Sequence, residues 1–110
     1  MQNVYTIKDR GVQVMDLGAF TLKEGATEQQ LFDVHAKVYK DFFSKCKGFV
    51  ENKLLFDGTK YYDLTIYESV NDARIAADAF AASFAPELYG KIINPPTEAE
   101  VPFFHILKSY

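Results

Sequence analysis

The sequence is poor in cysteine and in long apolar runs, and each shortage excludes a class of protein. Its single cysteine, Cys46, cannot form a disulfide within the chain, and no Cys/His cluster has the spacing of a zinc site. No stretch approaches the roughly 18 consecutive apolar residues of a membrane-spanning helix. Residues 1–5 lack a basic segment followed by an apolar run, so we expect no secretory signal. We therefore expect a cytoplasmic protein with no membrane partner and no metal.

Positive charge is also scarce. The 110 residues contain 12 Lys and Arg against 15 Asp and Glu, which gives a net charge of −3. Binding to a nucleic-acid backbone needs a concentrated basic face, whereas these lysines are scattered along the chain. We therefore expect no nucleic-acid partner. Aromatic side chains are abundant instead, with 10 Phe and 7 Tyr, and a chain of this length can build one core without cross-links.

The pattern of apolar and turn-forming residues predicts six main elements and a short extra helix. A β-branched run predicts a strand over 12–22, in which Gly18 indicates a bulge or a close backbone approach. Thr27 and Gln30 form a capping-box pattern that begins a helix, and Gly48 ends that helix. Ser69 is the N-cap of a second long helix. The remaining elements are two strands joined by a turn, the short helix and a final strand, over 49–56, 61–67, 86–94 and 102–110.

The order strand, helix, strand, strand, helix, strand is that of the split βαβ, ferredoxin-like fold. It predicts one α+β domain over residues 11–110, with a four-stranded antiparallel sheet and two helices on one face. Residues 1–10 are expected to form an N-terminal arm, in which 4–7 can add an edge strand. Both sides of the strands carry large apolar groups, such as Leu64 and Tyr67, although helices cover only one face. An uncovered apolar sheet face is unusual for a monomer, so we predict a homodimer through it.

Four segments together show the pattern of a known family. They are Gly48-Phe49, Tyr67-Glu68-Ser69, the spaced Ala73, Ala76, Ala77 and Phe80, and Pro102-Phe103-Phe104. Over residues 12–85 and the last strand, the chain resembles the antibiotic-biosynthesis-monooxygenase family of dimeric α/β barrels. The resemblance implies two ferredoxin-like protomers packed sheet to sheet, each with a pocket between its sheet and its helices. Relatives include cofactor-independent oxygenases of anthrones and quinols, haem-degrading enzymes and proteins of no known activity.

The haem-degrading branch of that family can be tested residue by residue. Its members carry a Trp at the end of the third strand and an axial His about ten residues later, where this sequence has Tyr67 and Ala77. No histidine occurs between Ser69 and Pro86, so we expect no haem. The resemblance to the oxygenases implies no cofactor at all, because their deprotonated substrate reduces O₂ itself. The sequence also lacks a Gly-rich phosphate loop and a nucleophile elbow.

His35 is the residue that the helical periodicity singles out. At 100° per residue it falls in the middle of an apolar stripe that contains Leu31, Phe42 and Cys46. The ring therefore faces the sheet, where burial favours its neutral form. A neutral imidazole suits a general base that deprotonates a phenol-like substrate. A structural core histidine with satisfied hydrogen bonds is the alternative, and the sequence leaves both open.

Six further residues are candidates for a substrate pocket. They are Tyr39, Asn52, Tyr67, Phe80, Phe84 and His105. Tyr39 lies one turn from His35, so it either orients that ring or only packs. Tyr67 continues a row with Thr65 and Asp63 that either lines a cavity or faces water. Structural roles are the alternative for the rest. Phe80 and Phe84 can simply belong to the core, Asn52 can face solvent, and His105 can be a core or interface residue.

Three hypotheses about function follow. The first is a small dimeric, cofactor-independent monooxygenase-like enzyme, an oxidoreductase that acts on a small aromatic or quinol-type substrate with His35 as the base. The second is a non-catalytic dimer whose pocket binds a small molecule or is filled by its own side chains. The third is a cofactor-free isomerase or another proton-transfer enzyme that uses the same base. Dependence on O₂ separates the first hypothesis from the third.

Overall fold

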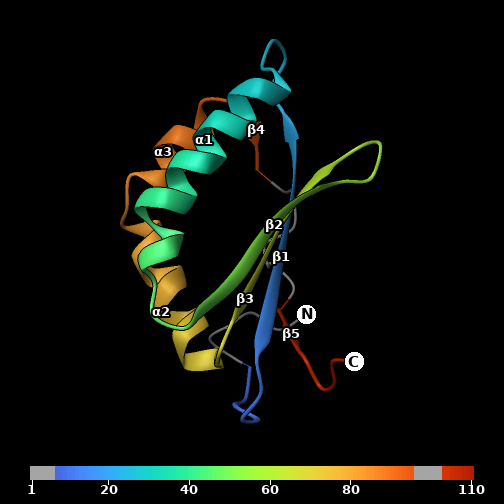
Figure 1. Cartoon of the computed structure of the whole chain (residues 1–110). Coiled ribbons are helices and arrows are strands. Elements are labelled where there is room, and N and C mark those ends of the chain that lie inside the picture. Colours follow the sequence, from blue (N-terminus) through green and yellow to red (C-terminus); the bar gives the residue numbers. More distant parts are fainter. Residues whose placement is uncertain (1–6, 96–102) are drawn as a thin grey trace.

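The computed structural model of the chain describes residues 7–95 and 103–110. An antiparallel sheet carries the helices on one of its faces (Figure 1). The strands are β1 (Val14–Leu22), β2 (Phe49–Phe56), β3 (Tyr61–Tyr67), β4 (Ile93–Asn94) and β5 (Phe103–His105). The helices are α1 (Glu28–Asp41), the 3₁₀ turn η1 (Phe43–Lys45), α2 (Val70–Ala81) and α3 (Ala85–Gly90). This order confirms the predicted ferredoxin-like arrangement.

In the described part of the chain the sheet has five strands, where the sequence predicts four. Its order is β2-β3-β1, and two short strands share the far edge of β1. There β5 pairs with the first residues of β1, and β4 pairs with Thr21 and Leu22 at its end. The strand β4 was not predicted. The chain enters it directly after α3, where the backbone N–H of Lys23 donates to the carbonyl of Ile92 at 2.9 Å.

The helix starts follow the capping patterns. The backbone N–H of Gln30 donates to the Thr27 hydroxyl at 3.2 Å, and the Gln30 side chain accepts from the Thr27 N–H at 2.8 Å. The Ser69 hydroxyl accepts from the N–H of Asp72 at the start of α2. The first helix ends earlier than predicted, at Asp41, and continues as the 3₁₀ turn. Gly48 then turns the chain into β2 with φ 78°, a conformation that glycine adopts without strain.

The C-terminal part of the chain differs most from the prediction. The helix predicted over 86–94 ends at Gly90, and the strand predicted over 102–110 is wrong in length. Of the described residues in this segment, Phe103–His105 pair with β1, and the Ile106 N–H then donates to the carbonyl of Gln13, just before β1 begins at Val14. Position 102 and most of the edge strand predicted over 4–7 lie outside the described residues.

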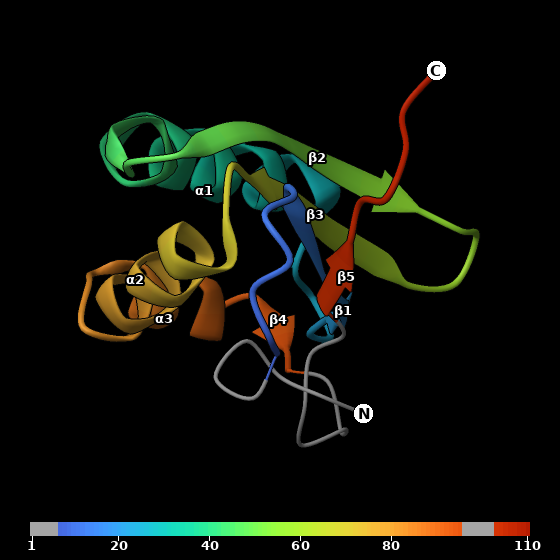
Figure 2. The same ribbon diagram turned by 90° about the horizontal axis from the view of Figure 1, so that it is seen from below.

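The core lies between the sheet and the helices. Viewed from below (Figure 2), α1 lies beside β2, and α2 and α3 cover the other side of the same face. Leu31 and Val38 of α1 and Val14 of β1 are completely buried. Ile7, in the predicted arm, is also buried and packs with Val14. The helices therefore cover one face of the sheet with a continuous apolar layer.

The opposite face of the sheet, here called the outer face, is also apolar. Leu17 of β1 lies directly across from Leu64 of β3, and none of the described helices packs against them (Figure 1). The alternation of the described paired strands places seven large apolar side chains on this face: Met15, Leu17, Leu55, Tyr62, Leu64, Ile66 and Phe104. Phe104 is 45% exposed.

Candidate functional site

His35 is hydrogen bonded on both sides of its ring, in the space between α1, α3 and the sheet. Its Nδ1 lies 2.7 Å from the hydroxyl of Tyr89 on α3, and its Nε2 lies 2.6 Å from Oδ1 of Asn52 on β2. The Asn52 amide nitrogen donates to the Asp63 carboxylate at 2.5 Å and to the Thr65 hydroxyl at 2.9 Å. One chain of hydrogen bonds therefore joins a helix-borne imidazole to a carboxylate on the central part of the sheet.

The partners of Asn52 determine which nitrogen of His35 carries the proton. An ionised Asp63 can only accept, so the amide nitrogen of Asn52 points toward it and the amide oxygen points toward His35. An amide oxygen also only accepts, so Nε2 of His35 must be the protonated nitrogen. The neutral ring then leaves the lone pair of Nδ1 to accept from the hydroxyl of Tyr89. Nδ1 is the nitrogen of His35 that can take up a proton.

Strand pairing builds the floor of this site. Asn52 lies across from Thr65, and Thr65 lies across from Asp16 of β1, so the three form one polar row on the helix-facing side. Asp63 lies two residues from Thr65 on the same side, because side chains along a strand alternate between faces. Thr65 is 1% exposed. A polar row on a buried face is the kind of lining that a ligand cavity has.

The carboxyl groups of this floor are held away from water. Burial first and the nearby charge of Asp63 second raise the pKa of Asp16 from its ordinary value to about 7, against hydrogen bonds from Thr65 that lower it. Burial also raises the pKa of Asp63, while positive charge on His35 and hydrogen bonds from Asn52 and Thr65 lower it. Two carboxyls so close together do not both ionise easily, and Asp16 therefore holds a proton up to neutral pH.

This raised pKa predicts a pH-dependent stability. Between about pH 4 and pH 7 folded Asp16 keeps a proton that the unfolded chain releases, so the free energy of unfolding falls as the pH rises through this range. We expect Asp16→Asn to remove much of that fall and to stabilise the protein by about 1–3 kcal/mol at pH 8 relative to wild type. Urea unfolding at pH 5 and pH 8 measures the effect, with Glu24→Gln in an exposed turn as the control. If the free energy of unfolding falls equally between pH 5 and pH 8 in wild type and in Asp16→Asn, the prediction is contradicted.

Gly18 leaves open space beside Asp63. The two residues lie directly across from each other on the helix-facing side, and the pairing of β1 with β3 runs through Gly18 without interruption. The predicted bulge or close backbone approach is therefore wrong. A Cβ atom added at Gly18 would meet no atom within 4 Å. The absence of a side chain here keeps space open above the sheet.

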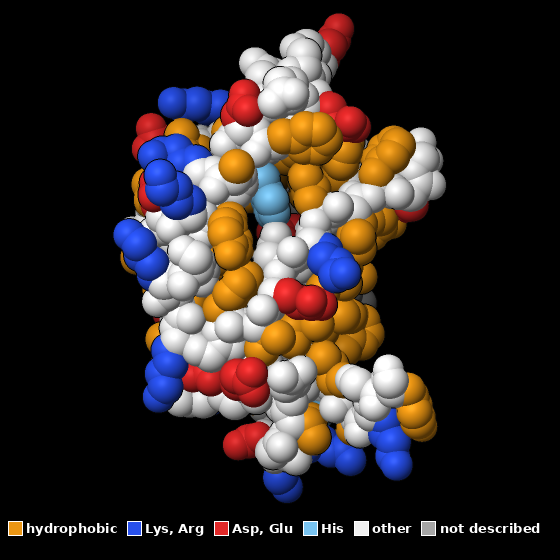
Figure 3. All heavy atoms as spheres, viewed as in Figure 1, with side chains coloured by type: hydrophobic (Ala, Val, Ile, Leu, Met, Phe, Trp, Pro, Cys, Tyr) orange, Lys and Arg blue, Asp and Glu red, His pale blue; other side chains and the backbone are white. Residues whose placement is uncertain are grey.

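The site is accessible from one side of the molecule. The space-filling view shows a hollow between α1 and the sheet, with a histidine side chain in it and hydrophobic side chains on both sides (Figure 3). The ring of His35 is half-buried, in agreement with its contact to the edge strand β2. Among the described residues, no three His, Cys, Asp or Glu side chains are grouped as metal ligands.

Three solved structures superpose on most of this chain. SnoaB from Streptomyces nogalater, described as a cofactor-independent oxygenase, matches with a TM-score of 0.69 and 17% identity, over 89% of this chain and 96% of its own. MupZ from Pseudomonas fluorescens has a TM-score of 0.61 and 15% identity, over 84% of this chain and 70% of its own. A protein from Shewanella oneidensis has a TM-score of 0.59 and 19% identity, over 90% and 95%.

The chain has the ferredoxin-like fold of SnoaB. This is the fold that the resemblance to the antibiotic-biosynthesis-monooxygenase family implies, and the structural likeness confirms it. No protein-family model matches the sequence, and no curated protein matches it. At these identities the shared property is the fold, so the chemistry has to be argued from the residues of this chain.

The structure brings together only some of the residues predicted for a pocket. His35 and Asn52 are in direct contact. Tyr39 is 46% exposed and packs edge-on against Phe49 of β2. The helix α1 lies beside β2, which is an edge strand of the sheet (Figure 2). Tyr39 therefore shares the apolar stripe of the helix with His35 but is exposed, whereas His35 is half-buried.

The other predicted pocket residues lie in different surroundings. Phe80 packs in an aromatic cluster with Phe42, Phe43 and Tyr89, whereas Phe84 is exposed under the ammonium group of Lys37. Two more face the helices beside Val14. These are Tyr67, which is buried, and His105, which is half-buried. The sequence left open which face of the sheet His105 lies on. Its position across from Val14 places it on the face that meets the helices.

Two residues of the site were missed by the sequence analysis. Tyr89 lies on the short helix α3, and nothing in the local sequence indicates that its hydroxyl reaches α1. Asp16 did carry a signal, because it shares the period-two positions of Val14 and Phe20 inside an apolar strand. A charged residue at such a position predicts a polar group on the buried face.

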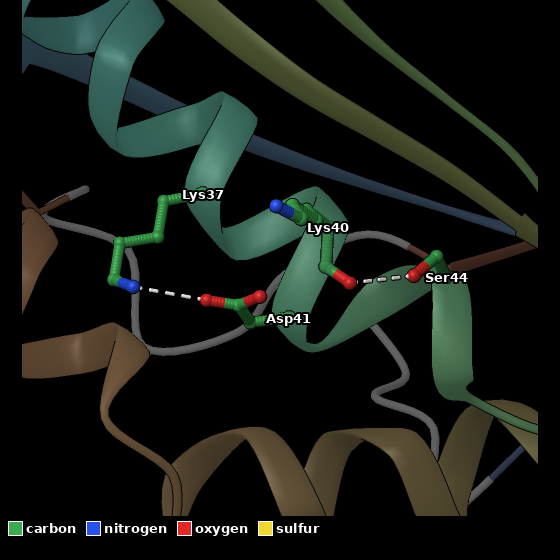
Figure 4. Close-up of polar contacts among 4 residues, drawn as sticks. All are labelled: Lys37, Lys40, Asp41 and Ser44. Atoms are coloured by element: carbon green, nitrogen blue, oxygen red, sulfur yellow. Dashed lines mark hydrogen bonds and ion pairs between the residues drawn. The ribbon is translucent and has the colours of Figure 1, made fainter.

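A separate groove of about 300 Å³ lies on the helix layer, between the end of α1 and α2. Its lining residues are Asp41, Phe42, Lys45, Cys46, Lys47, Asp72, Ile75, Ala76 and Ala79. At its border Lys37 bonds Asp41 at 2.9 Å and the Ser44 hydroxyl donates to the carbonyl of Lys40, which closes the last turn of α1 (Figure 4). Burial raises the pKa of the Cys46 thiol. The groove does not include His35.

None of the helices in the described part of the chain is long and apolar enough to cross a membrane.

Proposed function

We propose that the protein is a cofactor-independent, monooxygenase-like enzyme that acts on a small aromatic or quinol-type substrate between its sheet and its helices. The observation that carries the proposal is the ring of His35, held between Asn52 and Tyr89 with Nδ1 placed as a proton acceptor. The fold shared with SnoaB, which is described as a cofactor-independent oxygenase, supports the reaction class.

His35 is placed to remove a proton from a phenol-type hydroxyl. A general base must lie within about 2.6–3.2 Å of the oxygen that loses the proton. The hydroxyl of Tyr89 lies 2.7 Å from Nδ1, which supports the fit of a phenol oxygen at this position. In the proposed reaction the substrate hydroxyl takes the place of the Tyr89 hydroxyl. Burial raises the pKa of Tyr89, so Tyr89 keeps its own proton and does not act as a competing anion.

Tyr89→Phe tests whether Tyr89 only occupies the position of the substrate. The change keeps the aromatic ring in its cluster with Phe80 but removes the hydroxyl from Nδ1. We expect kcat to stay within about threefold of wild type, with a loss of about 1 kcal/mol in the free energy of unfolding for one hydrogen bond. Steady-state oxygen uptake and urea unfolding measure the two effects. A fall in kcat of a hundredfold would instead make Tyr89 a proton relay.

Deprotonation makes the substrate electron-rich enough to react with O₂ directly. For an anthrone-type substrate, two C–H bonds at one carbon break and a C=O bond forms with one oxygen atom. The two hydrogen atoms leave with the other oxygen atom as water. The carbon supplies all four electrons that O₂ accepts, so the balance needs no further reductant. The protein orients the ring, excludes water and holds the base within reach of the proton.

The space above Gly18 is proposed to hold part of the substrate ring. A series Gly18→Ala, Gly18→Val and Gly18→Leu fills this space in steps, and φ at Gly18 permits other residues. We expect the Val and Leu variants to raise KM at least about tenfold, while Gly18→Ala gains up to about 1 kcal/mol of stability because glycine is unfavourable in a strand. Oxygen uptake and thermal unfolding measure both. An unchanged KM in Gly18→Leu would place the substrate elsewhere.

The outer face is proposed to pair two copies of the chain. Leu17 and Leu64 sit at the middle of an apolar sheet surface that none of the described helices covers. A second copy would bury this surface in the sheet-to-sheet manner that the family resemblance implies. Phe104, already 45% exposed, lies on the same face. The proposed enzyme is therefore a homodimer with one site in each protomer.

Oxygen uptake by the purified protein tests the proposed function. We would measure it with anthrones, hydroquinones and catechols, with no added metal or flavin and after treatment with a chelator. Uptake above the rate without protein is the expected result. Turnover of a substrate without loss of O₂ would favour an isomerase that uses the same base. Tight binding of the same compounds without any reaction would favour a binding protein.

A further inference from the structure

Within residues 7–95 and 103–110, the side chain that bonds Nε2 of His35 is Asn52, and the same side chain bonds the carboxylate of Asp63. Asn52 occupies the position between them, with its oxygen on the imidazole and its nitrogen on the carboxylate. The amide dipole is therefore aligned between a ring that becomes positive and a group that is negative. Such an alignment transmits charge without moving a proton.

We propose that Asp63 is a positioning residue for His35, which acts through Asn52 to keep the proton on Nε2 and to stabilise the positive charge that the ring gains when Nδ1 accepts a proton. This inference rests on the proposed function for its catalytic meaning. The chemistry of the step is one proton transfer: the O–H bond of the substrate breaks, an N–H bond forms at Nδ1, and the negative charge stays on the substrate oxygen.

The geometry makes Asp63 the controlling group for the orientation of Asn52. Thr65 also contacts the amide nitrogen, but a hydroxyl both donates and accepts and so tolerates either orientation of the amide. Only an ionised carboxylate requires the nitrogen on its side. Without Asp63, Asn52 can turn its nitrogen toward His35, which then needs a lone pair on Nε2 and a proton on Nδ1. That tautomer has no acceptor for the substrate.

Asp16 is a second buried carboxyl near this arrangement. Burial and the charge of Asp63 raise the pKa of Asp16 to about 7, so Asp16 stays protonated up to about neutral pH. An uncharged Asp16 adds no negative charge near His35, so its removal leaves the effect of Asp63 on His35 in place. The charges of Asp16 and Asp63 act on Tyr67 of β3, and the charge of Asp63 also acts on Tyr89 of α3. Cys46, after η1, acts on Tyr67 as well. Burial raises the pKa of all three, so they remain neutral near pH 7.

The test is the tautomer and titration of His35 by ¹⁵N NMR of the imidazole nitrogens in the full chain. The chain has only 2 His, so loss of one signal set in His35→Gln assigns the ring. In wild type we expect the neutral ring to carry its proton on Nε2. A neutral wild-type ring with the proton on Nδ1 overturns the proposal without any variant of Asp63.

Two variants then separate charge from hydrogen bonding. Asp63→Asn keeps an acceptor for Asn52 but removes the charge, and we expect the pH midpoint for protonation of His35 to fall by about one unit, a tenfold change in proton affinity. Asp16→Asn is the matched control, a second buried carboxyl replaced in the same way, and we expect the midpoint to stay the same. Equal downward shifts in both variants would show a general loss of negative charge and overturn the specific role of Asp63.

Asp63→Leu removes the hydrogen bond as well, and we expect a clear population of the tautomer with the proton on Nδ1, which Asp63→Glu reverses. If Asp63→Leu does not fold, the tautomer of the wild-type ring and the comparison of Asp63→Asn with Asp16→Asn still test the proposal. The NMR readout needs no substrate, so it succeeds or fails independently of oxygen uptake. Where turnover is found, the acid limb of the pH–rate profile should move to lower pH in Asp63→Asn, as the NMR midpoint does.

Discussion

Replacement of His35 by glutamine is expected to lower oxygen uptake by about 10²- to 10⁴-fold, the range that a general base contributes to catalysis. Glutamine is close to histidine in size and can reach the same partners, Asn52 and the Tyr89 hydroxyl, with its amide. Its nitrogen cannot accept a proton at neutral pH. The variant therefore removes the base and keeps the packing, so kcat should fall while thermal unfolding changes little.

The comparison with His35→Ala separates chemistry from structure. Alanine leaves the amide oxygen of Asn52 and the hydroxyl of Tyr89 without a partner, and each unsatisfied buried group costs about 1–3 kcal/mol. We expect the alanine variant to be both inactive and less stable. Lys40→Gln, on the exposed side of the same helix, is the control for uptake. If the glutamine variant retains full activity, His35 is a structural residue and the proposed base is wrong.

Introduction of a carboxylate at Leu64 is expected to convert the proposed dimer to a monomer. Leu64 lies on β3 between Leu17 of β1 and Lys53 of β2, at the middle of the outer face. A sheet-to-sheet dimer would bury two copies of the new charge, and an unpaired buried charge costs about 3–5 kcal/mol. We therefore expect Leu64→Asp to weaken association by more than about 10³-fold. Light scattering or sedimentation at micromolar concentration measures the change.

The control for this effect is a similar change on a surface that lies away from the outer face. Ile75 of α2 is 54% exposed on the helix side of the molecule, so Ile75→Asp should leave the oligomeric state unchanged. A wild-type protein that is monomeric at high micromolar concentration would contradict the proposed dimer directly. A dimer that survives Leu64→Asp would show that the copies associate through another surface.

Local chemistry was sufficient to predict most of the elements. The capping residues Thr27 and Ser69 begin α1 and α2 as expected, because an N-cap is decided within about four residues. The bounds of β2 and β3 are also as predicted, since turn residues at 57–58 separate two β-branched and aromatic runs. The order of these elements then predicts the ferredoxin-like fold, in which the apolar stripe of each helix packs against the sheet.

Contacts between distant segments were decided by the tertiary structure alone. The sequence placed His35 on the buried side of its helix, but not its partners: Asn52 comes from the edge strand and Tyr89 from a short helix 54 residues away. The length of β5 and the existence of β4 depend on where β1 begins and ends, and a strand has no local signal for the partner that it meets.

The sequence by itself thus determined the fold class, the helix starts and the inward direction of one imidazole, because periodicity and capping are local properties of the chain. Only the tertiary structure decided that this imidazole is bonded through an amide to a shielded carboxylate, and that Gly18 leaves space beside that carboxylate. The physical reason is strand register. A shift of one residue between β1 and β3 would turn Asp16 and Asp63 to opposite faces and abolish the site.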